Sequence, residues 1–258
     1  MALTEIILTR HGKKVKSKDI PNIECPLSEE GLKESFEMGQ SVLERDYDLI
    51  TVIHSPYVRT RQTAEQILAG AGYDLNAEGI GIIERSGIGM IEGVDYTKGL
   101  PPFGDSELLD EFVRAILTKC YFKHEDKTKP VMAGHASAML DSIDMGIGMQ
   151  KDSLTKDQKG LLLIVSHAAI LDSGLAVALD ALKTHIEGKE GYVTLGDFPG
   201  AHQQGEFSTG KAEYMKDGTV RYAFDVKGRT VTLTDEELKD RALEALRHSR
   251  YIHQKQAE

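Results

Sequence analysis

The chain has 258 residues, of which 40 % are hydrophobic and 28 % charged, and it contains only 7 prolines. This length and composition predict a globular protein with a substantial core and exclude a disordered chain. The formal net charge of −10 argues against general affinity for nucleic acid, because such affinity needs a basic surface.

The cysteines and the N-terminal segment limit the cellular setting. Cys25 and Cys120 show neither the spacing of a disulfide scaffold nor that of a structural zinc site. The segment MALTEIILTR carries an acid before a very short apolar run, which is unlike a signal peptide, and no apolar run is long enough for a membrane span. We therefore expect a cytoplasmic protein without a membrane partner.

Short apolar runs at 5–9, 49–53 and 161–165 predict strands buried on both faces of a mainly parallel sheet. Helical patterns lie between them. One follows Ser28, its predicted N-cap, and another follows Ser55 as N-cap and ends at Gly70. The alternation of strands and helices predicts an α/β fold, a three-layer α/β/α sandwich with crossover connections.

The segment 94–158 interrupts this alternation with a turn-rich stretch, a helix near 106–122 and a run rich in Met and Gly. We interpret it as a helical cap inserted into a single domain that spans 1–258. Beyond it, residues 213–226 predict a hairpin that turns at Asp217-Gly218. The last helix starts with a capping box, Thr234 to Glu237, and runs to about His248.

Polar side chains follow three of the predicted strands. Arg10 and His11 end the first strand, Arg59 lies in the helix after the second, and Ser166 and His167 follow the third. Because ligands of open α/β sheets bind beyond the carboxyl ends of the strands, we expect these groups around one pocket. Guanidinium groups bind phosphate oxygens, and an imidazole can attack phosphorus, so the set indicates phosphoryl chemistry that needs no metal.

Five segments, TRHG, PLSEEG, HSPYVRTRQTAE, ERSGIGMIEG and IVSHAAI, resemble the ordered motifs of the histidine phosphatase superfamily, also called the phosphoglycerate mutase-like family. The resemblance implies that His11 is the nucleophile and that Glu84 is the proton donor, with Glu92 as the alternative. The phosphate-binding residues that it implies are Arg10, Gly12, Arg59 and His167. Lys14 and Lys16 are candidates for substrate binding, and neither metal nor cofactor is expected.

The resemblance implies a metal-independent phosphomonoesterase acting on a small phosphate ester through a phosphohistidine. The mutases of the family usually carry Ser, Trp and Asn after the histidine, whereas this chain reads GKKVKS and has no tryptophan, which favours a phosphatase. The alternatives are a phosphoglycerate or phosphosugar mutase and a non-catalytic phospholigand-binding protein. His54, Arg61 and His135 are interpreted as structural.

Overall fold

The computed structural model describes residues 2–43, 46–90, 109–119, 132–187, 190–196 and 198–257. Its helices are α1 (Glu29–Val42), α2 (Val58–Gly70), α3 (Leu109–Lys119), α4 (Met132–Lys151), α5 (Ala168–Ala178) and α6 (Asp235–Ala257), with a short 3₁₀ turn at Ser86–Ile88. Its strands are β1 (Leu3–Arg10), β2 (Leu49–His54), β3 (Ile80–Glu84), β4 (Lys159–Ser166), β5 (Leu182–Glu187), β6 (Glu190–Leu195), β7 (Phe207–Tyr214), β8 (Val220–Val226) and β9 (Arg229–Thr234).

The central sheet has seven strands in the order β3-β2-β4-β1-β7-β8-β9. The first four are mutually parallel, and β7, β8 and β9 continue the sheet in antiparallel pairs. Arg10 lies opposite Ser166 and His54 lies opposite Val165 in the register. The carboxyl ends of β1, β2 and β4 therefore meet at one edge, as the sequence predicted, and the structure places β4 between the other two.

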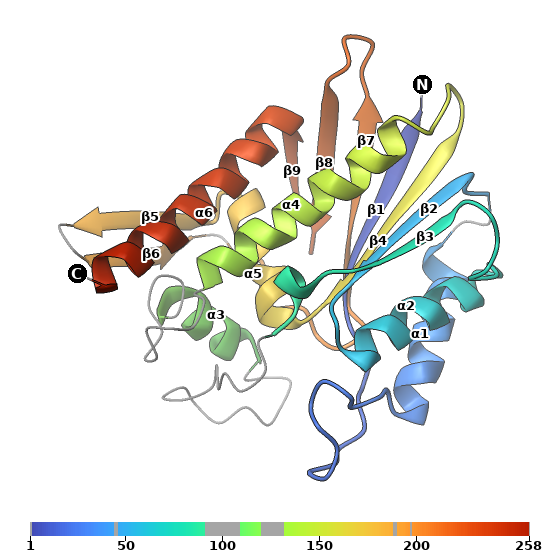
Figure 1. Ribbon diagram of the computed structural model, residues 1–258, viewed down its shortest axis with the longest axis horizontal. Coiled ribbons are helices and arrows are strands. Elements are labelled where there is room, and N and C mark those ends of the chain that lie inside the picture. The colour runs from blue at the N-terminus through green and yellow to red at the C-terminus, as the bar shows by residue number, and fades with distance from the viewer. Residues whose placement is uncertain are drawn as a thin grey trace.

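Helices cover both faces of the sheet, which confirms the three-layer sandwich. Alternate strand residues such as Ile7, Val52 and Leu163 pack toward α1 and α2. Their neighbours in sequence face the core shared with α4, α5 and α6. Figure 1 shows α4 crossing one face of the sheet with α6 alongside it. A Cβ at Gly39 would lie 1.9 Å from the carbonyl oxygen of Ile67, so glycine allows α1 to pack closely on α2.

Of the two predicted N-caps, the structure confirms one and contradicts the other. The Ser28 hydroxyl caps α1 by accepting a hydrogen bond from the Gly31 amide at 3.1 Å, which confirms the prediction. Helix α2 starts at Val58 after Tyr57, so Ser55 as its N-cap was wrong. The Ser55 hydroxyl is instead engaged with the side chains of Thr60 and His167.

Only part of the segment 94–158 lies within the described residues. Residues 91–108 and 120–131 lie outside the described residues, and α4, which falls within the predicted cap, packs against β2 and β4 of the sheet. Ile143 and Ile147 of α4 are buried in the core, and a Cβ at Gly146 would lie 2.5 Å from Leu162 of β4. A small residue at this position permits the close contact, and composition alone did not reveal it.

The C-terminal predictions are confirmed with one extension. The hairpin between β7 and β8 turns at Gly218, whose φ of 88° suits glycine. In the capping box, the Glu237 carboxylate accepts from the Thr234 amide at 2.7 Å, and the Glu237 amide donates to the Thr234 hydroxyl at 3.2 Å. Helix α6 continues to Ala257, beyond the predicted end. Across the described ranges, none of the helices combines the length and the apolar character that a membrane crossing requires.

Candidate active site

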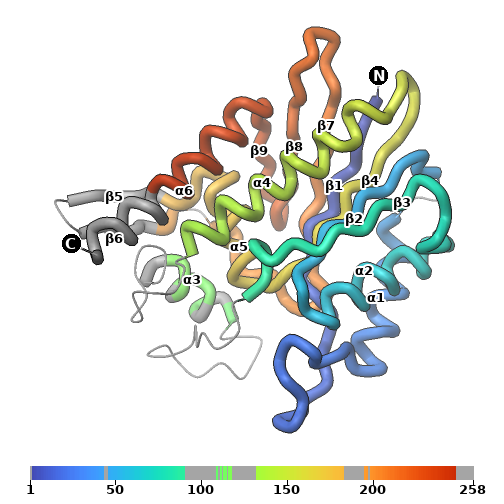
Figure 2. The backbone as a smooth tube through the Cα atoms, viewed as in Figure 1, coloured from blue at the N-terminus to red at the C-terminus, as the bar shows by residue number. Residues whose placement is uncertain are grey.

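The carboxyl edge of the parallel strands gathers the predicted catalytic groups. Arg10 ends β1 and His11 follows it, and Ser55 follows β2. Ser166 ends β4, and His167 lies between β4 and α5. Figure 2 traces the loop from the end of β1 to α1 (blue) along this edge. Because α2 and α5 begin here, their N-terminal amide groups favour an anion in the same region.

The ring of His11 is held in one orientation from both sides. Its Nδ1 lies 2.8 Å from the Gly12 carbonyl oxygen, and its Nε2 lies 3.1 Å from Nε of Arg59. A carbonyl only accepts and a guanidinium only donates, so Nδ1 carries the proton and Nε2 presents its lone pair. Burial, followed by the charges of Arg59 and Arg10, lowers the pKa of His11 well below its usual value. The residue is therefore a neutral imidazole with Nε2 as its nucleophilic atom.

His167 lies beside His11, with ring centroids 5.1 Å apart in an edge-to-face arrangement. Its Nε2 lies 3.0 Å from the Ser55 hydroxyl, and the ring of Tyr57 packs against it at 4.6 Å. Burial and then the neighbouring charges, with His11 the largest of them, lower the pKa of His167 well below its usual value. Its Nδ1 is buried and has no hydrogen-bond partner among the described residues.

Two guanidinium groups flank these imidazoles. Arg59 donates from Nη1 to the Asn22 carbonyl at 2.6 Å and lies over the Tyr57 ring at 4.3 Å. Arg10 donates from Nη1 to the His202 carbonyl at 3.1 Å, and its buried Nε has no partner in the described part of the chain. Burial lowers the pKa of each arginine to about 10, so both stay cationic at neutral pH. Neither forms an ion pair with a carboxylate among the described residues, and their charge is therefore available to an anionic ligand.

The structure places Gly12 and Lys14 next to this cluster. The Gly12 amide donates to the Thr63 hydroxyl at 3.0 Å, and a Cβ at Gly12 would lie 2.9 Å from the Ser35 hydroxyl. Glycine is thus required by the approach of α1. Lys14 is half-buried and donates to the Asn22 side chain at 3.0 Å, and burial, then the charge of Arg59, lowers its pKa. Lys14 and Arg59 therefore share Asn22.

The other candidates from the sequence lie apart from the cluster. Lys16 is exposed. The neighbouring Lys13, which is not among these candidates, forms ion pairs with Glu30 and Glu34 of α1 at 2.5 and 2.8 Å. Glu84 ends the edge strand β3 opposite His54 and is exposed. Because β2 lies between β3 and β4, the end of β3 is about 10 Å from that of β4 at the usual strand spacing. Glu92 lies outside the described residues.

The side chains interpreted as structural have local partners. His54 bonds through Nδ1 to the Ser55 carbonyl at 2.7 Å, and Arg61 pairs with Glu65 at 2.8 Å on the surface of α2. His135 is buried on α4, with Nδ1 3.0 Å from the Gly87 carbonyl. The described residues contain no group of three His, Cys, Asp or Glu side chains that could hold a metal ion.

Sequence reasoning missed several residues of the site. Ser55 was assigned to a helix cap, although its place between a strand end and a proline was visible. The role of Asn22 could not be predicted from the sequence. Its backbone carbonyl accepts from Arg59 and its side-chain oxygen accepts from Lys14, and both contacts depend on the conformation of the loop. Asp172 and His202 were also missed. Asp172 is a single carboxylate in an otherwise apolar helical segment, and that isolation was a signal in the sequence.

Comparison with known proteins gives a family match for the N-terminal third of the chain. Residues 6–93 match the model of the histidine phosphatase superfamily, branch 1. This match assigns residues 6–93 to the histidine phosphatase superfamily. The matched range contains Arg10, His11 and Arg59, whereas His167 lies beyond it. The search of curated proteins found no match for the chain.

Several solved structures share the fold of this chain over most of its length. A structure titled Mycobacterial hydrolase 2 has a TM-score of 0.57 and 14 % identity, covering 94 % of this chain and 98 % of its own. Mycobacterial hydrolase 1 has a TM-score of 0.55 and 13 % identity, with coverages of 88 % and 99 %. A mycobacterial glucosyl-3-phosphoglycerate phosphatase has a TM-score of 0.55 and 11 % identity, with coverages of 87 % and 98 %. At these identities the likeness concerns the fold.

Proposed function

We propose that this chain is a metal-independent phosphomonoesterase of the histidine phosphatase superfamily and that it works through a covalent phosphohistidine on His11. One observation carries the proposal. The Nδ1 of His11 is fixed on the Gly12 carbonyl, so the lone pair of Nε2 is directed to the same side as Arg59. The attacking atom and a cation that binds phosphoryl oxygens are thus adjacent.

Two buried nitrogens that lack partners among the described residues support phosphate binding. Nε of Arg10 is a permanent donor, and Nδ1 of His167 is a donor when the Ser55 hydroxyl donates to Nε2 of that ring. Unsatisfied buried polar atoms are costly, and phosphoryl oxygens would satisfy both. With Arg59, these donors surround a phosphoryl group next to His11 and stabilise the charge on its oxygens.

The reaction has two displacement steps. In the first, the Nε2–P bond forms while the P–O bond to the alcohol breaks, and an acid gives the leaving alkoxide its proton. In the second, water attacks phosphorus, loses a proton to the same carboxylate as it adds, and releases inorganic phosphate from His11. Glu84 is the proposed acid and Glu92 is the alternative. Because Glu84 stands at the edge strand, a leaving group that reaches it would extend across the end of β2.

The small phosphate ester is expected to meet positive charge at the site although the whole chain is acidic. Lys14 adds a third cation to Arg10 and Arg59, and Lys16 stands further out on the same loop. Such local charge accelerates the encounter with an anionic substrate. A location in the cytoplasm is part of the same proposal.

The test is hydrolysis of p-nitrophenyl phosphate in the presence of EDTA, comparing the wild type with His11→Ala. We expect turnover in the wild type and its loss in the variant by a factor of about 10³ or more. Thermal unfolding of both proteins controls for folding. Activity that depends wholly on added magnesium would contradict the proposal, as would a fully active His11→Ala protein.

A further inference from the structure

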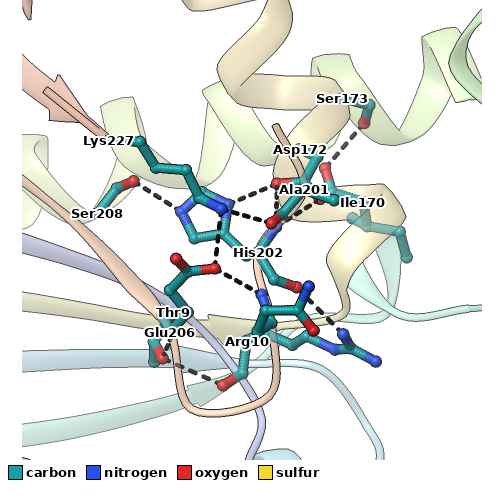
Figure 3. A network of polar contacts seen from close by, with 11 residues as sticks. Thr9, Arg10, Ile170, Asp172, Ser173, Ala201, His202, Glu206, Ser208 and Lys227 are labelled. Carbon is teal, nitrogen blue, oxygen red and sulfur yellow. Dashed lines mark hydrogen bonds and ion pairs between the residues drawn. The ribbon is translucent and has the colours of Figure 1, made fainter. Parts of the chain in front are cut away.

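Arg10 of the candidate active site is held by a buried polar network, which Figure 3 shows. Its Nη1 donates to the carbonyl oxygen of His202. The His202 ring binds Asp172 through Nδ1 at 2.5 Å and the Ser208 hydroxyl through Nε2 at 2.7 Å. The His202 amide also donates to the Asp172 carboxylate, at 3.2 and 3.3 Å. The side chains of His202 and Asp172 are fully buried.

The fold brings this network to Arg10 from distant parts of the chain. Strand β7 runs antiparallel to β1, so the loop before β7 arrives at the carboxyl end of β1. The Glu206 carbonyl of that loop accepts from the Arg10 amide at 3.2 Å and from the Thr9 hydroxyl at 3.0 Å. Asp172 lies on α5, the helix that follows His167. One helix thus connects the second imidazole to the network behind Arg10.

A buried carboxylate–imidazole pair contributes little net stability to a fold, because burying its polar groups carries a large desolvation penalty. Burial raises the pKa of Asp172, and the contacts with His202 oppose this effect. Replacing such a pair by apolar side chains of similar volume is often neutral or stabilising, so its presence here calls for a role other than stability. The network fixes the position of one backbone carbonyl, and that carbonyl holds the guanidinium.

The choice of a carbonyl as the partner of Arg10 has an electrostatic consequence. A carboxylate bonded directly to the guanidinium would neutralise it and compete with a phosphate. A carbonyl orients Nη1 and leaves the net charge available. The charges of Asp172 and Glu206 still favour the protonated guanidinium, against the cost of its burial.

We infer that Asp172 and His202 are positioning residues that hold Arg10 so that its Nε donates to the phosphate. The inference rests on the proposed function, because it takes the ligand of Arg10 to be a phosphoryl group. Ser208 completes the arrangement by fixing the far side of the His202 ring.

The test is calorimetric titration of the full chain with inorganic phosphate, which needs no turnover. We expect Asp172→Asn to raise the dissociation constant for phosphate about tenfold, the effect of one hydrogen bond to a charged group. Ser173→Ala is the matched control. Ser173 is the next residue of α5 and is equally buried, and its hydroxyl bonds to the Ile170 carbonyl at 2.8 Å, away from Arg10. Phosphate affinity should be unchanged in this control.

A double-variant cycle separates positioning from a general structural role. If Asp172 acts through Arg10, adding Asp172→Asn to the Arg10→Lys protein weakens phosphate binding little further. An equal effect of Asp172→Asn in both backgrounds overturns the inference and leaves the proposed function intact. Absence of phosphate binding by the wild type overturns both.

If Asp172→Asn does not fold, the inference can still be tested with a variant that removes a single hydrogen bond of the network. Ser208→Ala removes only the contact with Nε2 of His202, and we expect it to raise the dissociation constant about threefold. An unchanged dissociation constant in a folded Ser208→Ala protein, together with unchanged binding in His202→Gln, would overturn the inference.

Discussion

Two neighbouring regions of this molecule contain buried polar groups, and they differ in whether those groups have hydrogen-bond partners. The strand-end cluster consists of Arg10, His11, Ser55, Arg59 and His167, and the support network consists of Asp172, His202 and Ser208. In the strand-end cluster, Nε of Arg10 and Nδ1 of His167 have no partner among the described residues. In the support network, both ring nitrogens of His202 and the carboxylate of Asp172 are bonded.

This difference indicates a division of roles. Groups left without partners in a buried site are ready to bind a ligand, whereas fully bonded groups hold their neighbours in place. Variants of the strand-end cluster should therefore change the rate of the chemical step. Variants of the support network should change phosphate affinity through Arg10.

The largest effect in this comparison is expected for Arg59→Ala. Arg59 contacts the attacking nitrogen of His11 and supplies charge to the phosphoryl oxygens, so kcat/KM should fall about 10³-fold. Steady-state hydrolysis of p-nitrophenyl phosphate measures it. Arg61→Ala, two residues along the same helix and exposed, is the control and should keep wild-type activity. A loss for Arg59→Ala no larger than that for Asp172→Asn would remove the distinction between the regions.

A change in the proton donor should depend on the leaving group. Glu84→Gln should reduce the hydrolysis of an alkyl phosphate about 10²-fold. Hydrolysis of p-nitrophenyl phosphate should change little, because p-nitrophenolate leaves without a proton. Glu78→Gln is an exposed control near the start of β3. If Glu92→Gln shows this pattern and Glu84→Gln does not, the assignment of Glu84 is wrong.

The two lysines of the loop after β1 offer a matched pair with a smaller effect. Lys14→Ala should raise KM about threefold to tenfold, because Lys14 is half-buried and electrostatically coupled to Arg59. Lys16→Ala should leave KM unchanged, because Lys16 is exposed. The measurement is the dependence of both KM values on ionic strength. Equal KM changes in the two variants would mean that the loop attracts the substrate only through its net charge.

The smallest effect concerns the pH dependence of stability. His11, His167 and His135 have a lower pKa in the folded chain than the usual value near 6.5. Below about pH 6.5 the unfolded chain binds more protons than the folded one, so stability is complete above that pH and falls as the pH decreases. Each imidazole contributes about 1 kcal/mol per pH unit in this window.

Thermal unfolding at about pH 7.5, 6 and 5 checks this expectation. The Tm should fall with decreasing pH, and His11→Gln should reduce the slope, because one buried neutral imidazole has been removed. A Tm that is constant or rises between about pH 6.5 and pH 5 would show that these imidazoles titrate normally.

The strand-end cluster could be located from the sequence, because each of its groups lies within a few residues of a short apolar strand. Parallel strands then bring Arg10, His11 and His167 together without any further information. Ser55 was in the right segment but was given the wrong role, because capping propensity does not reveal a competing side-chain partner such as His167.

The support network and the layer helix α4 were not predicted, for a different reason. His202 meets Asp172 only because β7 adds to the sheet beside β1, and a single sequence contains no signal for that pairing. The segment that contains α4 was interpreted as part of an inserted helical cap, whereas Gly146 permits α4 to pack closely on β4. Both depend on contacts between distant parts of the chain.

The central claim, a phosphohistidine on His11, is tested most directly by trapping the intermediate. The wild type is mixed with a ³²P-labelled phosphate ester, quenched in alkali, and its labelled peptide is sequenced. We predict an alkali-stable, acid-labile label on His11 that is absent from His11→Ala. Substrate turnover with the label on another residue, or with no label on the protein at any quench time, would contradict the account.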